Sequence, residues 1–356
     1  MALPIGCAPL GGAARLRPLG HDKIYAPNLG ETYKMPRTHT IRLIMQMTEK
    51  MLFKKTKTLA TITLIFLLGA CTKMNYEKGE ELYNQKDYTH ALPLLTKAAA
   101  DGYADAQFRL GTMYYYGNGT TLDYKRALEW LTKAAEQGND RAQVVVGNIY
   151  YQGEGVEVDY RKAIFWFEKS ALQNNGGAQT MLGVVYHDGT GVPQNHTQAI
   201  AYFQKASENK EIQAEYALGT MYFNGEGVPQ DYLKATSYFE ASANQGSSLG
   251  QHALGNIYFS GKGTEIDYKK AFYWYEKAAN QDNSSAQLNL GLLYRDGLGV
   301  KKNIVEAHKW LNIASANGEN QADIARSEVE RTMSSNQISE SQKLASNWLA
   351  YHRKNK

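Results

Sequence analysis

The chain has 356 residues, a formal net charge of +4 and two cysteines. Ten of its 39 basic residues but only three of its 35 acidic residues lie in residues 1–71, so the remainder has 29 basic and 32 acidic residues and a formal charge of −3. Because that remainder shows no basic stripe, nothing in it indicates nucleic-acid binding. Both cysteines, Cys7 and Cys71, belong to the first part, so the rest must fold without disulfides.

Residues 1–50 are rich in glycine, proline and arginine and show no helical or strand periodicity. We interpret them as a disordered leader or an over-long gene start, with Met45, Met47 or Met51 as alternative first residues.

A different composition begins at residue 51. Three lysines, Lys54, Lys55 and Lys57, precede an apolar stretch over residues 59–70 that is too short to span a bilayer as a helix. This pattern is typical of a secretory signal peptide, which we place at residues 51–70. An unprocessed hydrophobic anchor is the alternative.

The end of this stretch, Leu68-Gly69-Ala70-Cys71, resembles the lipobox of bacterial lipoproteins. The resemblance implies cleavage before Cys71 and acylation of Cys71, with palmitate-like chains that would hold the protein on the membrane. Thr72 stands where an aspartate would favour the inner membrane in that family, so the resemblance implies the outer membrane.

A repeat with a period of 36 residues follows. It consists of a small residue, a glycine five positions later and a tyrosine three positions further. The six copies are Ala106-Gly111-Tyr114, Ala142-Gly147-Tyr150, Ala178-Gly183-Tyr186, Ala214-Gly219-Tyr222, Gly250-Gly255-Tyr258 and Ala286-Gly291-Tyr294. A fixed period of this length predicts stacked supersecondary units, which usually bind macromolecules.

One unit, residues 103–138, predicts two antiparallel helices of about 13 residues each. Apolar residues recur at helical spacing up to Tyr114, and Gly117-Asn118-Gly119 ends the first helix. Asp123 is the expected N-cap of the second helix, which Gly138 ends. Bulky aromatic residues recur in the second helix and predict a core shared by neighbouring hairpins: Trp130, Trp166, Tyr202, Tyr238, Trp274 and Trp310.

The motif Ala-Gln-x-x-Leu-Gly-x-x-Tyr, the Gly-x-Gly loop and Asp-Tyr-x-x-Ala-x-x-Trp resemble the Sel-one-like repeat (SLR) family, relatives of tetratricopeptide repeats. The resemblance covers residues 76–318 and implies an all-α solenoid, a right-handed superhelix of antiparallel helix pairs. We expect a tetratricopeptide-like first hairpin at residues 71–102, six repeats at 103–318, and capping helices with a short tail at 319–356. The first hairpin has a shorter loop than the others, and Pro93 is expected to kink its second helix mildly.

In related repeats the first helix of each hairpin lines a concave surface. The side of that helix away from the core should carry residues such as Phe108, Thr112 and Tyr115 and their equivalents. The partner-binding residues expected on this basis are Tyr115, Asn148, Tyr151, His187, Tyr216, Thr220, Phe223, His252, Asn256, Phe259 and Arg295. Asparagine amides can bind a peptide backbone, and aromatic rings offer contact area with little loss of rotamer freedom.

An alternative remains open for the aromatic residues in this set. They could pack against the Gly-x-Gly loop of their own unit and leave no surface for a partner. The exposure of Tyr151, Phe223 and Phe259 distinguishes the two interpretations.

The sequence carries little that indicates chemistry. The glycine loops lack the lysine and the preceding strand of a phosphate-binding loop, and the eight histidines form no metal motif. Some cysteine-rich relatives carry a β-lactamase label, and Ser207-Glu208-Asn209-Lys210 fits Ser-x-x-Lys, but the companion motifs are missing. We therefore expect no enzyme activity, no cofactor and no small-molecule substrate.

The predicted function is that of a non-catalytic protein-binding scaffold, lipid-anchored in the bacterial cell envelope and facing the periplasm. A surface-exposed protein that binds host proteins is the alternative. A regulatory adaptor for an envelope sensor or a peptidoglycan enzyme is a third interpretation.

Overall fold

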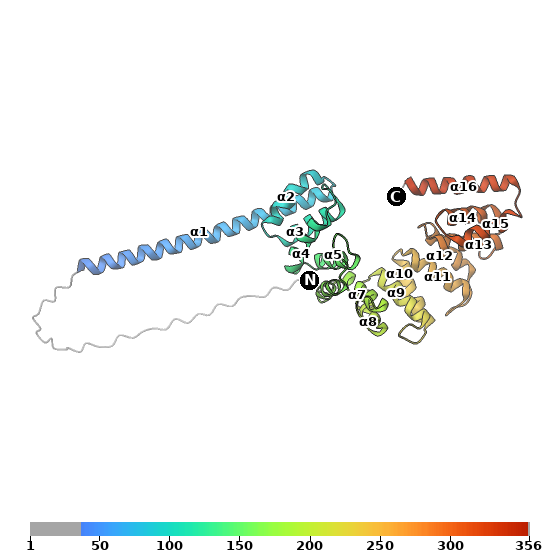
Figure 1. The fold of residues 1–356 in the computed structure, drawn as a ribbon, viewed down its shortest axis with the longest axis horizontal. Helices are drawn as coiled ribbons and strands as arrows, with labels where there is room; N and C mark the ends of the chain where they lie inside the picture. The colour runs from blue at the N-terminus through green and yellow to red at the C-terminus, as the bar shows by residue number, and fades with distance from the viewer. Residues whose placement is uncertain (1–36, 355–356) are drawn as a thin grey trace, which may run out of the picture. The chain divides into compact units, whose positions relative to one another are not determined.

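The structure is a computed structural model that describes residues 37–354, without the side chains of residues 37–41, 44, 56 and 58–71. The described residues form sixteen helices and no strand (Figure 1). The chain divides into two compact units, residues 1–66 and 67–356, and each is considered by itself. The predicted all-α solenoid of antiparallel helix pairs is confirmed in the second unit.

Seven consecutive hairpins make up most of the second unit. The first hairpin pairs the end of α1 with α2. The bounds are α1 Arg37–Asn84, α2 Tyr88–Ala100, α3 Ala104–Tyr116, α4 Tyr124–Glu136, α5 Asp140–Gln152, α6 Tyr160–Ala171, α7 Gly176–Asp188, α8 His196–Glu208, α9 Ile212–Asn224, α10 Tyr232–Asn244, α11 Ser248–Ser260, α12 Tyr268–Ala279, α13 Ser284–Asp296, α14 Ile304–Ala316, α15 Asn320–Glu330 and α16 Ser335–Lys354.

The start of α1 differs from the sequence prediction. We expected no helix before residue 51, but α1 begins at Arg37 and continues through the predicted signal segment into the first hairpin. Residues 37–68 contain neither glycine nor proline and are rich in leucine, isoleucine, methionine and lysine, so nothing in them ends a helix. No helix among the described residues combines the length and the apolar character needed to cross a membrane.

Caps set the helix boundaries as predicted. Asp123 accepts a hydrogen bond from the backbone N–H of Arg126, and the residues at the same position of the later repeats, Asn195 among them, cap their helices in the same way. The first helix of the unit ends at Gly117, whose φ of 70° is left-handed and favours glycine.

The recurring spacing of small residues along the chain has a packing reason. A Cβ atom on Gly147 would lie 2.5 Å from the Phe167 ring, so glycine is what lets α5 and α6 approach closely. Gly111 and Leu131 repeat the same contact in the preceding hairpin. Each helix packs mainly against its neighbours along the chain, and the first helices α7 and α9, and α11 and α13, also contact each other directly.

The C-terminal end departs from the repeat. Helix α16 packs against α14, and its Trp348 ring lies 5.5 Å from the Trp310 ring. Helix α15 buries Ala322, Ala325 and Val329 against α13 and α14, but it has Arg326 and Ser327 where the repeat has leucine and glycine, so the close contact with a second helix of its own hairpin is missing. Helix α16 therefore covers the last hairpin, α13–α14, as we expected of a cap.

Candidate functional site

The candidate site is the solvent-facing side of the first helices α3, α5, α7, α9, α11 and α13, which we call the first-helix surface. Near the end of α3, α5, α7, α9 and α11, an aromatic or histidine ring contacts the first residue of the following helix, edge to face. The ring pairs, with their centroid separations, are Tyr115–Tyr124 (5.5 Å), Tyr151–Tyr160 (5.5 Å), His187–His196 (5.3 Å), Phe223–Tyr232 (5.1 Å) and Phe259–Tyr268 (5.5 Å). In the last repeat Arg295 replaces the ring and forms ion pairs with Asp296 and Glu328.

The Gly-x-Gly loop of the following repeat reaches several of these rings. The Tyr115 hydroxyl donates to Glu154 Oε2 over 2.5 Å, and Lys262 Nζ lies 5.0 Å from the centre of the Phe223 ring. Burial, together with the hydrogen bond to Glu154, raises the pKa of Tyr115. These loops therefore join successive repeats along the first-helix surface, whereas the alternative left open from the sequence placed the rings against the loop of their own repeat.

The rings remain accessible in spite of these contacts. Tyr151 and Phe223 are half-buried, and Phe259 is 41% exposed. The interpretation in which all three are buried within one hairpin is therefore wrong.

A polar cluster occupies the C-terminal part of the same surface. Asn256 is exposed, and its Oδ1 accepts hydrogen bonds from the Tyr275 hydroxyl at 2.7 Å and from Asn289 Nδ2 at 3.4 Å. Asn289 Nδ2 also lies 3.1 Å from His252 Nε2. Because Asn256 Oδ1 is held from two sides, its Nδ2 is left to face solvent as a donor.

Tyr275 and Asn289 were not among the predicted site residues. Tyr275 occupies the position that holds leucine or phenylalanine in the other repeats. The feature of the sequence that could have identified it is therefore one hydroxyl group at a position that is otherwise apolar. Burial raises the pKa of Tyr275, and burial also lowers the pKa of His252.

Three other predicted residues make contacts of a different kind. The Thr220 hydroxyl donates to the Tyr216 carbonyl in its own helix, and the Tyr216 ring packs against Phe239 at 5.8 Å. Asn148 is half-buried, and its Oδ1 is buried without a hydrogen-bond partner. These side chains therefore offer a partner fewer accessible hydrogen-bonding groups than Asn256 does.

The predicted lipidation site lies in the first helix. Cys71 lies within α1, but its side chain is outside the described part of the structure. Cys7 lies outside the described residues altogether.

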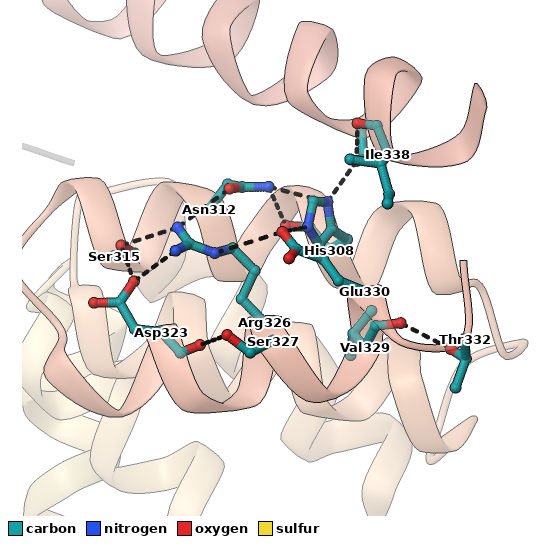
Figure 2. Close-up of polar contacts among 11 residues, drawn as sticks. His308, Asn312, Ser315, Asp323, Arg326, Ser327, Val329, Glu330, Thr332 and Ile338 are labelled. Carbon is teal, nitrogen blue, oxygen red and sulfur yellow. Dashed lines mark hydrogen bonds and ion pairs between the residues drawn. The ribbon is translucent and has the colours of Figure 1, made fainter. Parts of the chain in front are cut away.

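One group in the C-terminal cap has the residue types of a hydrolytic triad (Figure 2). His308 Nδ1 lies 2.6 Å from Ser341 Oγ, and His308 Nε2 lies 2.8 Å from Glu330 Oε1. His308 and Ser341 are both 0% exposed, so no substrate can reach the serine. Asn312 and Arg326 extend the network, which joins α14, α15 and α16.

The Ser-x-x-Lys segment also has a structural role. The Lys210 N–H donates to the Ser207 carbonyl over 2.9 Å, and Lys210 has a φ of 61°, so the segment forms the turn that ends α8. No cluster of three or more histidine, cysteine or acidic side chains suited to a metal ion occurs among the described residues.

Comparisons with known proteins agree with this geometry. The family model of the Sel1 repeat matches residues 65–103, 104–139, 140–175, 177–210, 212–247, 248–283 and 284–319. The first match includes the hairpin that we expected to be tetratricopeptide-like. A search of curated proteins found no match.

Two solved structures are similar over much of the chain. The antigen c5321 of uropathogenic Escherichia coli, described as a protective antigen with an SLR fold, is 32% identical with a TM-score of 0.74, and the match covers 80% of this chain and 61% of the antigen. A Sel1 repeat protein from Oxalobacter formigenes is 36% identical with a TM-score of 0.65, and the match covers 68% of this chain and 99% of that protein. The chain belongs to the Sel1-repeat family.

Proposed function

We propose that the protein is a non-catalytic scaffold that binds a protein or peptide partner along the first-helix surface. The fold supports this, because Sel1 repeats are in general a protein-interaction architecture. The observation that carries the proposal is the exposed set formed by Phe259 and the Asn256 amide, which presents an apolar ring and a hydrogen-bond donor about one turn apart.

The chemistry of this set suits an extended segment of a partner. A carbonyl of the partner backbone can accept from Asn256 Nδ2, while a neighbouring side chain packs on Phe259. The network through Tyr275 and Asn289 holds the Asn256 amide in place before the partner arrives, which reduces the entropy lost on binding.

We place the protein in the bacterial cell envelope, anchored by lipid on Cys71 in the outer membrane and facing the periplasm. The support is the lysine-rich and then apolar pattern before the Leu-Gly-Ala-Cys segment. A second candidate is display on the cell surface and binding of host proteins. The description of the Escherichia coli relative as a protective antigen favours it.

Photo-cross-linking on intact cells tests the proposal. A cross-linking residue at Phe259 should trap a partner, and one at Lys125, exposed on the start of α4, should not. The double variant Asn256→Ala/Phe259→Ala should abolish a product formed from a cross-linker at Phe223. The same products from both faces, or none from Phe259, would contradict the proposal, and protease treatment of whole cells separates periplasmic from surface display.

A further inference from the structure

Buried amides join the repeats on the opposite end of the hairpins from the Gly-x-Gly loops. Five first helices carry a buried glutamine whose Oε1 accepts from an amide 30 residues later, at the end of the second helix. Four of these glutamines also donate from Nε2 to a carbonyl eight residues earlier, in the preceding hairpin. The glutamines are Gln107, Gln143, Gln179, Gln251 and Gln287.

One repeat has a carboxyl group in place of this amide. Glu215 is 5% exposed and accepts from Gln245 Nε2 at 2.6 Å, so it reproduces one of the two contacts. An ionised carboxylate has no hydrogen to donate to the Ser207 carbonyl, which lies eight residues earlier, whereas a protonated carboxyl has one. Burial raises the pKa of Glu215, and the hydrogen bond from Gln245 offsets this only in part.

No charged group compensates Glu215. In the part of the chain that the structure describes, it forms no ion pair, although charged residues lie at the end of α8, the start of α9 and in α10. These residues are Lys205, Glu208, Lys210, Glu211 and Glu240.

The same two hairpins carry a second titratable contact, on the first-helix surface. His187 Nε2 lies 3.0 Å from Glu226 Oε2 in the next loop, and His187 Nδ1 lies 2.6 Å from Asp188 Oδ1. The ring of His196 from α8 faces His187, and its Nδ1 is buried without a partner. In the first repeat of this length the equivalent contact is the hydrogen bond from the Tyr115 hydroxyl to Glu154, which contains no histidine.

The electrostatic environment favours the charged form of His187. Burial works in the opposite direction, but the hydrogen bonds to Glu226 and Asp188 raise the pKa of His187 above its ordinary value. The hydrogen bond from His187 lowers the pKa of Glu226 in spite of partial burial.

We propose that the junction between the hairpins α7–α8 and α9–α10 is a proton-dependent contact that is tight in mild acid and loosens as the pH rises. Two separate groups on opposite ends of the hairpins favour the protonated form: the Glu215 carboxyl because it is buried, and the His187 imidazole because it contacts Glu226 in the following loop. The α4–α5 junction has the Gln143 amide and the Tyr115–Glu154 hydrogen bond at these positions, and the α10–α11 junction has the Gln251 amide and Lys262 over the Phe223 ring, so neither has the buried carboxyl or the histidine. The inference does not depend on partner binding.

The direction follows from the pKa shifts. A group whose pKa is raised in the folded protein stabilises it fully below its unfolded pKa, and that contribution is lost as the pH rises through the folded value. The pKa of Glu215 is raised above the ordinary range of a carboxyl group, and the pKa of His187 is raised above that of an imidazole. Both contributions are therefore lost as the pH rises through these raised values. Glu226 sets the lowest pH at which the contact with His187 is stable, because the contribution of Glu226 is lost when the pH falls through its lowered pKa.

Hydrogen exchange of the full chain tests the proposal. Exchange is measured at about pH 5 and about pH 8 and corrected for intrinsic rates, and the protection of α9 is divided by the protection of α5, whose junction uses Gln143 and the Tyr115–Glu154 bond. We expect this ratio to be lower by about threefold or more at the higher pH. An unchanged ratio would overturn the proposal.

Variants that copy the sister repeats provide the control. His187→Tyr and Glu215→Gln introduce residues that already occupy these positions in other repeats, so the fold should be retained. The double variant should show the same ratio at both pH values, and Gln143→Glu should transfer a pH response to the α4–α5 junction. A double variant that keeps the full pH dependence of the wild type would refute the assignment to these two groups.

Discussion

The substitution Trp166→Ala tests whether stability is local to neighbouring repeats. Trp166 is 8% exposed and packs in one cluster with Phe108, Leu131 and Val146, which come from α3, α4 and α5. Replacing a buried tryptophan with alanine costs roughly 3–5 kcal/mol. Because each helix contacts mainly its neighbours, this loss should fall on α3–α6.

Hydrogen exchange resolved by peptide measures the effect. A loss of this size corresponds to a decrease of about 100-fold to about 4,000-fold in the protection of the affected helices, since 1.4 kcal/mol is about tenfold. The protection of α13 and α14 should change little. Phe165→Ala is the matched control, because Phe165 precedes Trp166 in α6 but is 48% exposed, and the cost expected for a surface change is about 0.5 kcal/mol. Equal losses from end to end, or equal costs for the two variants, would refute the reasoning.

Three further predictions concern single positions. Tyr275→Phe removes the hydrogen bond to Asn256 but copies the phenylalanine of sister repeats, so the free energy of unfolding measured in urea should fall by about 0.5–1.5 kcal/mol. Partner binding should weaken by more than this, and unchanged binding would argue against the role of Asn256. Gly183→Ala puts a Cβ atom 2.5 Å from the Phe203 ring and should lower stability by about 1–3 kcal/mol, whereas a stabilised variant would show that the hairpin has room. Cys71→Ser should move the protein from the membrane fraction to the soluble fraction and remove the acyl mass, and a variant that stays in the membrane fraction would exclude the lipid anchor.

The helices and their ends were predictable because local chemistry determines them. The periodicity of apolar residues, Gly117 in a left-handed conformation and the cap at Asp123 each act within one or two turns of the chain. The start of α1 was not predictable in the same way. The glycine and proline residues before residue 37 suggested an unstructured leader, and no cap residue marks the point at which the helix begins.

The sequence predicted which equivalent positions of successive repeats belong to the candidate site, but it did not predict which side chains contact each other. Tyr115 and Glu154 are 39 residues apart, and which loop reaches which ring depends on how adjacent repeats stack. Tyr275 escaped because it lies in a core column, and only the structure shows that its hydroxyl extends to Asn256 on the surface. The packing of α16 on α14 likewise depends on His308 and Ser341, whose contact no local pattern encodes.

Excision of one repeat tests the layered architecture most directly. Deleting residues 176–211 removes α7 and α8 and places Asn175, an N-cap residue, directly before Ile212 at the start of α9. If the hairpins are equivalent layers, the shortened chain should keep the helical content per residue and unfold cooperatively, with a modestly lower midpoint. Loss of helical structure throughout the chain would show that the hairpins depend on one common core and would contradict the account.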